Sequence, residues 1–158
     1  MEEMSLIRKE LIKIDSDLSD RDACLSYLID KADELHLLND KKIYRQAVEA
    51  RERTMPTSLG FLVAIPHGKS DAVIEPFVGI LRTKKEFVWD HNSKHLVKLV
   101  LMIGVPQTDT GNHHLLFLSE VSKKIVDDAF KEQLFTVKSE QEMYELMNEV
   151  NKKVRERQ

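Results

Sequence analysis

The stretch of sequence that most constrains the fold spans positions 96–103 and reads LVKLVLMI. All of its residues except Lys98 are apolar. Such a run is typical of a strand that is covered on both faces, because a strand with one wet face alternates apolar and polar residues. We therefore expect this segment to lie inside a sheet with other elements packed on both sides.

Three further strands are predicted nearby, at 62–65, 77–81 and 87–89, since these segments are short and rich in branched or aromatic residues. All five glycines and all four prolines lie between positions 56 and 111. The two flanks contain neither residue type. Because Gly and Pro are the least favourable residues inside a helix, the flanks are predicted to be helical and the centre to form strands and turns.

Apolar residues recur at helical spacing in four segments of the flanks. Candidate caps for three of these helices are Ser19 or Asp20, Asp40, and a capping box from Ser139 to Glu142. Helices before and after a block of strands predict an α/β fold. We expect one domain over residues 1–158, with a mixed β-sheet of about four to five strands sandwiched by helices.

Composition excludes several classes of protein. The chain has 158 residues and a formal net charge of −3, so it offers no basic excess for nucleic-acid binding. A single cysteine, Cys24, forms no internal disulfide and suits a reducing compartment. The longest apolar stretch, 99–105, is far shorter than the roughly 20 residues that span a bilayer. We expect a soluble, cytoplasmic protein with no direct insertion into the membrane.

The sequence does not match the spacing of common nucleotide-binding and hydrolase motifs. The tripeptide from Gly68 resembles the end of a phosphate-binding P-loop, but Val63 stands where the motif requires its first glycine. Neither Gly-x-Gly-x-x-Gly nor Gly-x-Ser-x-Gly is present. No cofactor and no metal are predicted. A zinc hydrolase stays open as an alternative, with ligands from His67, His91, His95 and either His113 or His114.

His67 differs from the other histidines because it stands where an apolar strand is predicted to stop. Pro66 before it cannot extend a central ladder, and Gly68 after it permits a sharp turn and a close approach of the backbone to a ligand. These neighbours favour an imidazole ring that is accessible to a ligand over one that is packed in the core. A purely structural histidine remains the alternative on these grounds.

Two segments together resemble a known family. The run from Arg51 to Gly68 fits R-E-x-x-x-P-T-x-L-G-x-x-x-A-x-P-H-G, and a second segment reads NHHL at 112–115. This pattern is similar to the fructose/mannitol-type enzyme IIA proteins of the bacterial phosphoenolpyruvate-dependent sugar phosphotransferase system, and is closest to the mannitol branch. The resemblance extends from about Leu6 to Val150.

The resemblance implies a phosphotransferase component that works as a phosphocarrier. His67 would take a phosphoryl group, through Nε2, from a histidine of the small carrier protein HPr. It would then pass the group to a cysteine of an enzyme IIB domain, which phosphorylates a sugar or polyol during uptake through a membrane IIC permease. A regulatory IIA domain, whose phosphorylation state controls a partner protein, is the alternative.

The resemblance also assigns two supporting residues. Arg51 matches the family's active-site arginine and would neutralise phosphoryl oxygens. His114 matches the second histidine and would donate a hydrogen bond from the first turn of its helix. From the residues alone, Arg51 could equally cap its helix and His114 could be a core residue. His113 is the weaker candidate beside His114.

The sequence departs from the family at two positions. Many fructose-type members have T-G-x-G-x-G before the active-site histidine, and here Ser58 and Leu62 replace two of those glycines. The departure favours the mannitol-like branch. Phe61 and Leu62 would form an apolar docking patch for HPr and IIB if they are exposed, or packing residues if they are buried.

Overall fold

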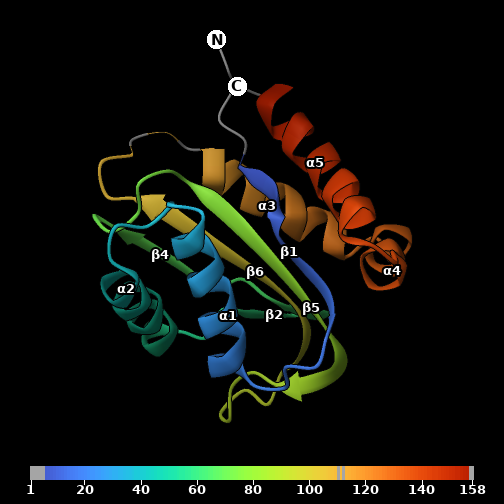
Figure 1. Cartoon of the computed structure of the whole chain (residues 1–158). Helices are drawn as coiled ribbons and strands as arrows, with labels where there is room; N and C mark the ends of the chain where they lie inside the picture. The colour runs from blue at the N-terminus through green and yellow to red at the C-terminus, as the bar shows by residue number, and fades with distance from the viewer. Residues whose placement is uncertain (1–5, 110, 112, 157–158) are drawn as a thin grey trace.

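The computed structural model describes residues 6–109, 111 and 113–156, without the side chain of Arg155. Within these ranges six strands form one mixed sheet with helices on both faces (Figure 1). The strands are β1 (Ile7–Ser16), β2 (Ser58–Gly60), β3 (Leu62–Ala64), β4 (His67–Ser70), β5 (Phe77–Val88) and β6 (Leu96–Pro106). The helices are α1 (Arg21–Glu34), α2 (Lys41–Thr54), α3 (His113–Ile125), α4 (Asp128–Thr136) and α5 (Glu140–Glu156). The α/β class with a mixed sheet is confirmed, with one or two strands more than predicted.

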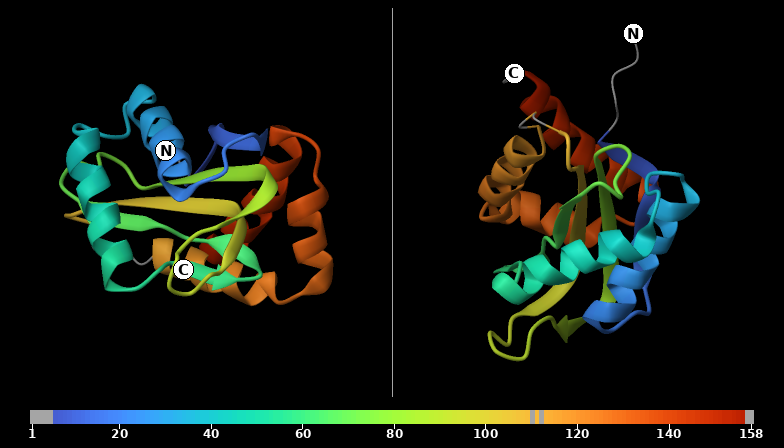
Figure 2. Two further views of the ribbon diagram at one scale, coloured as in Figure 1. Left: turned by 90° about the horizontal axis from the view of Figure 1, so that it is seen from below. Right: turned by 90° about the vertical axis from the view of Figure 1, so that its left-hand side faces the viewer.

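Strand β6 is the centre of the sheet. It lies antiparallel to β5 on one side and parallel to both β3 and β4 on the other, with β1 parallel to β5 at one edge. Leu99, Leu101 and Ile103 pack in one core with α3, α4 and α5, while Val100 and Met102 pack in a second core with α1 and α2. Figure 2 shows the two helical layers on opposite faces of the sheet. The prediction that 96–103 is covered on both faces is thereby confirmed.

Strand β1 contradicts the predicted helical N-terminal flank. It pairs in parallel with β5, and Ile12 lies opposite Ile80. Three of its buried residues are isoleucines, whose branched side chains fit a pleated surface better than a helix. The absence of glycine and proline permits a helix but does not require one. Here the pairing with β5 makes the segment a strand.

The predicted turn at Gly68 is also wrong, because residues 67–70 continue as β4. His67 lies opposite Ile103 and Gly68 opposite Gly104 of β6. Pro66 donates no hydrogen bond, yet its carbonyl accepts one from the backbone N–H of Ile103 at 2.9 Å, so the sheet runs on past it. A Cβ at Gly68 would lie 3.1 Å from Cγ2 of Val48. The glycine therefore lets α2 approach the sheet closely.

The predicted caps are confirmed where side chains bond the backbone. Asp20 accepts from the N–H of Ala23 at 2.7 Å, and Asp40 from Lys42 and Ile43. Ser139 accepts from the N–H of Glu142 at 3.1 Å, but the Glu142 carboxylate accepts from the N–H of Lys138 at 3.3 Å instead of that of Ser139, so the predicted capping box is confirmed only in its first half. Two other features differ from the prediction: the sequence pattern does not predict α4, and residues 87 and 88 are the end of the long strand β5, with Trp89 just after it, rather than a separate strand.

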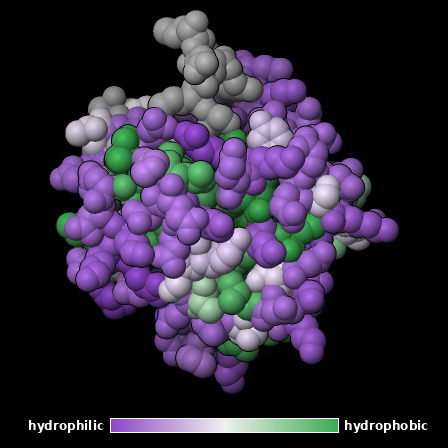
Figure 3. Space-filling view, in the orientation of Figure 1, coloured by the Kyte–Doolittle hydropathy of each residue, from purple (hydrophilic) through white to green (hydrophobic). Residues whose placement is uncertain are grey.

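In the orientation of Figure 1, hydrophilic residues cover most of the visible face and hydrophobic ones appear in small groups (Figure 3). Among the described residues, no helix combines the length and the apolar character that crossing a bilayer requires.

Candidate functional site

His67 is the first residue of β4 and is half-buried. Its Nδ1 lies 2.9 Å from the backbone carbonyl oxygen of Ile65. A carbonyl only accepts hydrogen bonds, so Nδ1 must carry the proton. In a neutral imidazole the lone pair then resides on Nε2. The local backbone thus fixes both the ring orientation and the nitrogen that can act as a nucleophile.

The geometry of β4 determines on which face of the sheet the His67 side chain lies. The Cβ direction of Gly68 points at Val48 and Ala47 of α2. Side chains alternate along a strand, so His67 and Lys69 point to the opposite face. Their partners on β6, Ile103 and Val105, both belong to the core on the α3 side, which agrees with this assignment.

His114 stands in the first turn of α3 and is half-buried on that same side. Burial lowers its pKa below the ordinary value, the positive charges of Lys69, His67 and His113 lower it further, and the carboxylate of Asp109 opposes them. Its Nδ1 is buried and bonds no other atom of the described residues. The site therefore favours a neutral His114 at neutral pH, close enough to His67 and Lys69 to respond to their charge.

The start of α3 is tied to α5 through His113. Its Nε2 lies 2.7 Å from Oδ1 of Asn151, a residue that is only 2% exposed. Beside this link, Leu6, Pro76 and Asp109 join both histidines in lining a cavity of ≈180 Å³. The contact anchors the turn of helix that presents His114.

Arg51 lies in α2, which belongs to the helical layer on the opposite face of the sheet from α3. Asn39, just before α2, donates to the carbonyl of Asp71, and Val48 of α2 packs on Gly68. After the helix, the backbone carbonyl of Thr57 accepts from the N–H of Ile65. Position 51 lies between the last two contacts, which bracket His67. The guanidinium of Arg51 itself donates to the carbonyl oxygen of Met55 at 2.7 Å, so it caps the end of α2. Arg51 thus belongs to the helical layer on the α2 face of the sheet.

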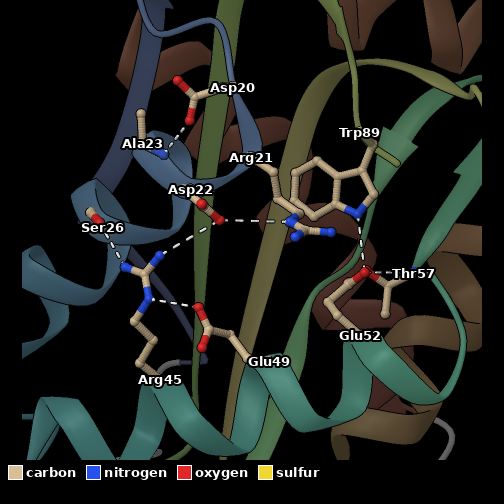
Figure 4. A network of polar contacts seen from close by, with 10 residues as sticks. All are labelled: Asp20, Arg21, Asp22, Ala23, Ser26, Arg45, Glu49, Glu52, Thr57 and Trp89. Atoms are coloured by element: carbon tan, nitrogen blue, oxygen red, sulfur yellow. Dashed lines mark hydrogen bonds and ion pairs between the residues drawn. The ribbon is translucent and has the colours of Figure 1, made fainter. Parts of the chain in front are cut away.

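A buried carboxylate shapes the segment that follows α2. Glu52 is 8% exposed and accepts from the N–H and hydroxyl of Thr57 and, at 3.2 Å, from Nε1 of Trp89 (Figure 4). Three donors compensate the cost of burying this charge. The network fixes the path of the chain from α2 into the hairpin before His67. It explains the glutamate and threonine of the signature as positioning residues.

The hairpin between β2 and β3 has an unusual backbone. Gly60, Phe61 and Leu62 have φ values of 82°, 56° and 68°. L-residues rarely adopt the left-handed region, which explains why glycine suits position 62. Phe61 is 49% exposed, with Nζ of Lys131 5.4 Å from its ring centroid, and Leu62 is half-buried. Of the two predicted patch residues, Phe61 is the one presented to solvent.

Other candidate chemistry receives less support. In the described part of the chain no three His, Cys, Asp or Glu side chains converge on a common point, and His95 instead bonds the hydroxyl of Ser58 at 2.9 Å. The zinc alternative thus lacks a ligand cluster. Burial raises the pKa of the Cys24 thiol to about 12, which leaves it unreactive. Four hollows larger than the cavity beside His114, of ≈270 to ≈740 Å³, are lined by neither His67 nor His114.

The structure thus places His67 and His114 near one another on the α3 face of the sheet, whereas Arg51 lies in α2 on the other face and bonds the carbonyl of Met55. Asn112 of the second matching segment lies outside the described residues. The sequence reasoning missed Lys69 as part of this group. In a strand every second side chain lies on the same face, so Lys69 shares the face of His67. The expectation of a turn at Gly68 prevented this inference from the sequence.

Known proteins resemble the chain over most of its length. A family model described as "Phosphoenolpyruvate-dependent sugar phosphotransferase system, EIIA 2" matches residues 5–150. The chain is 30% identical over 141 residues to the PTS system fructose-specific EIIA component of Haloferax volcanii, covering 89% of this chain and 91% of that protein. It is 27% identical over 147 residues to the fructose-specific EIIABC component of Bacillus subtilis, covering 93% of this chain but 23% of that longer protein.

Two solved structures share the fold. The nitrogen regulatory protein IIA-Ntr from Neisseria meningitidis matches with a TM-score of 0.80 at 24% identity, covering 90% of this chain and 96% of that one. Enzyme IIAMTL, in its complex with phosphorylated enzyme IIBMTL from Escherichia coli, matches with a TM-score of 0.74 at 19% identity, covering 91% and 99%. At these identities the likeness establishes the architecture of the domain.

Proposed function

This chain belongs to the phosphoenolpyruvate-dependent sugar phosphotransferase system EIIA 2 family, and from that premise we propose that His67 is the residue that carries the phosphoryl group. The protein is a phosphocarrier, a phosphotransferase component of sugar uptake. The observation that supports His67 most is the bond from its Nδ1 to the carbonyl of Ile65, because it leaves the lone pair of Nε2 available for phosphorus. All of residues 1–158 are proposed to form one EIIA domain.

In the proposed first step, the lone pair of His67 Nε2 attacks the phosphorus of a phosphohistidine on HPr. A new N–P bond forms while the donor's N–P bond breaks, and its electron pair returns to the imidazole of HPr. In the second step a cysteine thiolate of a IIB domain attacks the same phosphorus, an S–P bond forms, and the electron pair returns to His67. Both steps require positioning and charge neutralisation more than covalent chemistry from the protein.

His114 and Arg51 are proposed to hold the phosphoryl group. A neutral His114 without an acceptor for Nδ1 among the described residues places its proton best on Nε2, which then donates to a phosphoryl oxygen. The N-terminus of α3 adds the positive end of the helix dipole. Arg51 would exchange its bond to the carbonyl of Met55 for a phosphoryl oxygen when His67 is phosphorylated.

HPr and IIB are proposed to dock in alternation on one surface, since both must reach His67. Exposed apolar side chains beside the site suit this role: Met55 is 63% exposed, Leu59 42% and Phe61 49%. All three lie between the end of α2 and β3, the segment that leads directly to His67. We place this exchange in the cytoplasm, where both protein partners of such a carrier meet it.

The cargo is proposed to be a sugar or polyol of the fructose/mannitol type. Ser58 and Leu62 support the mannitol-like branch, whereas the two relatives named above carry fructose-specific names. Offering the phosphorylated protein to IIB domains of each type separates the branches. Faster transfer to a mannitol-type IIB would support the sequence argument, and faster transfer to a fructose-type IIB would overturn it.

Onward transfer also tests the transport role itself. The protein is loaded from phosphoenolpyruvate, enzyme I and HPr, purified, and mixed with a IIB domain while the phosphoryl group on each partner is followed. A transport IIA should lose its group to the IIB cysteine within the turnover time of uptake. A loaded protein that keeps its phosphoryl group with every IIB would support the regulatory alternative instead.

A further inference from the structure

We propose that Lys69 is a phosphoryl-binding residue, which contacts the group carried by His67 from the α3 face of the sheet. The inference rests on the proposed function, because it names a further ligand of the same phosphoryl group. Two features support the inference most: the alternation of side chains along β4 and the charged groups around His114.

The first observation is the shared face. Gly68 and the buried Ser70 occupy the α2 side of β4, so His67 and Lys69 stand next to each other on the other side. Residues two apart in a strand are separated by about 6.6 Å along the chain. A lysine side chain can span that distance, so its ammonium can reach oxygens bound to Nε2 of His67.

The second observation is that Lys69 is close enough to His114 for its charge to lower the pKa of that imidazole. The charge of His67 acts on the same imidazole. The α3 face thus carries a strand histidine, a helix histidine and a lysine, and the charges of the first and the last influence the helix histidine. A phosphoryl group on His67 would add its negative charge to this group of side chains.

The third observation is that the ammonium has no competing partner in the described part of the chain. Within residues 6–109, 111 and 113–156, Lys69 forms no ion pair, although it is exposed. Five other lysines do pair with carboxylates: Lys31, Lys41, Lys84, Lys123 and Lys152. Asp109, the acidic group acting on His114, does not engage Lys69 within the ion-pair distance of 4.0 Å.

Lysine suits a carrier that must release its load. Its ammonium is a mobile point charge with three donors, whereas arginine forms a fixed bidentate fork. Contact with one or two phosphoryl oxygens stabilises the charge during transfer without enclosing the group. An acceptor thiolate can then still approach along the line of the N–P bond.

The test compares Lys69→Met, Lys69→Arg and the matched control Lys85→Met. Lys85 is exposed and lies near the far end of β5, so the control loses the same charge away from His67. Each protein receives phosphoryl groups from phospho-HPr and, separately, from phosphoramidate, which needs no docking surface. Lys69→Met should be slowed about tenfold to 100-fold with both donors, as expected for the loss of a charge-assisted hydrogen bond. Lys69→Arg should keep most of the rate and Lys85→Met all of it.

Two outcomes would overturn the inference. One is an unchanged rate for Lys69→Met with both donors. The other is a loss confined to phospho-HPr, because it would assign Lys69 to docking rather than to the phosphoryl group.

A separate readout distinguishes failure of the inference from failure of the proposed function. NMR titration of His114 needs no phosphoryl transfer, and Lys69→Met should raise the pKa of that imidazole because a nearby positive charge is removed. No rise would contradict the inference even if the wild type is phosphorylated. A wild type that accepts no phosphoryl group from either donor would contradict the proposed function, and with it the role of Lys69.

Discussion

At the scale of single residues, the hairpin before His67 carries the clearest backbone strain. Leu62 holds φ at 68°, a conformation that costs an L-residue about 1–2 kcal/mol. At an ordinary strand position alanine is more stable than glycine by about 0.5–1 kcal/mol, because glycine loses more backbone entropy on folding. The order should be reversed at position 62.

We therefore predict that Leu62→Gly is more stable than Leu62→Ala by about 1 kcal/mol in urea unfolding. Both variants lose the same leucine packing, so the difference isolates the backbone. Leu59, in the same hairpin without a positive φ, is the control, and there alanine should be the more stable substitute. Finding alanine better at both positions would contradict the left-handed backbone at Leu62.

His114 makes a second prediction at this scale. Its pKa is lowered in the folded protein, so below the unfolded value of about 6.5 the unfolded chain binds a proton that the folded chain resists. The free energy of unfolding should fall as pH drops through that range, and level off below the folded pKa. His114→Gln should show a shallower fall between pH 7 and pH 5, measured by denaturant unfolding. Equal slopes would mean that burial and the charges around His114 leave its pKa at the unfolded value.

At the scale of elements, Arg82 of β5 anchors α4. The guanidinium is almost buried and donates to the carbonyls of Leu134 at 2.9 Å and Val137 at 2.6 Å, at the end of that helix. These carbonyls have no helical partner of their own. The arginine thus fastens the layer that includes α3 to the sheet.

Arg82→Met should therefore destabilise the protein by about 2–4 kcal/mol, because one buried and one partly buried carbonyl lose their donor and the ion pair of Arg82 with Asp15 is lost as well. Thermal or urea unfolding measures the loss. Lys84→Met removes a charge two positions along the same strand from an exposed ion pair with Asp17, and should change stability by less than about 1 kcal/mol. Similar effects for both substitutions would contradict the anchoring role of Arg82.

The elements also explain which parts of the fold the sequence predicts. Helix starts with an aspartate or a capping box depend on local hydrogen bonds, so Asp20, Asp40 and Ser139 identified them. Strands β1 and β4 depend on partners far along the chain. β1 has no breaker to exclude a helix, and β4 follows a proline that normally ends a strand. Only pairing with β5 and β6 settles both, and that pairing is not visible in local sequence.

At the scale of the whole molecule, the proposed site lies where the two layers meet one strand. His67 belongs to the sheet, His114 to α3 on one face, and Arg51 to α2 on the other. Motif resemblance supplied these three residues without their arrangement. Lys69 was identified only from the structure, because β4 determines that its side chain lies on the same face of the sheet as that of His67.

The central claim is that His67 carries the phosphoryl group, and intact-mass analysis tests it most directly. Wild type, His67→Ala and the control His36→Ala are incubated with phosphoenolpyruvate, enzyme I and HPr; His36 is exposed and lies just after α1. We predict one acid-labile phosphoryl group on wild type and on His36→Ala, and none on His67→Ala. A folded wild type that stays unmodified, or a His67→Ala variant that still gains the group, would contradict the account.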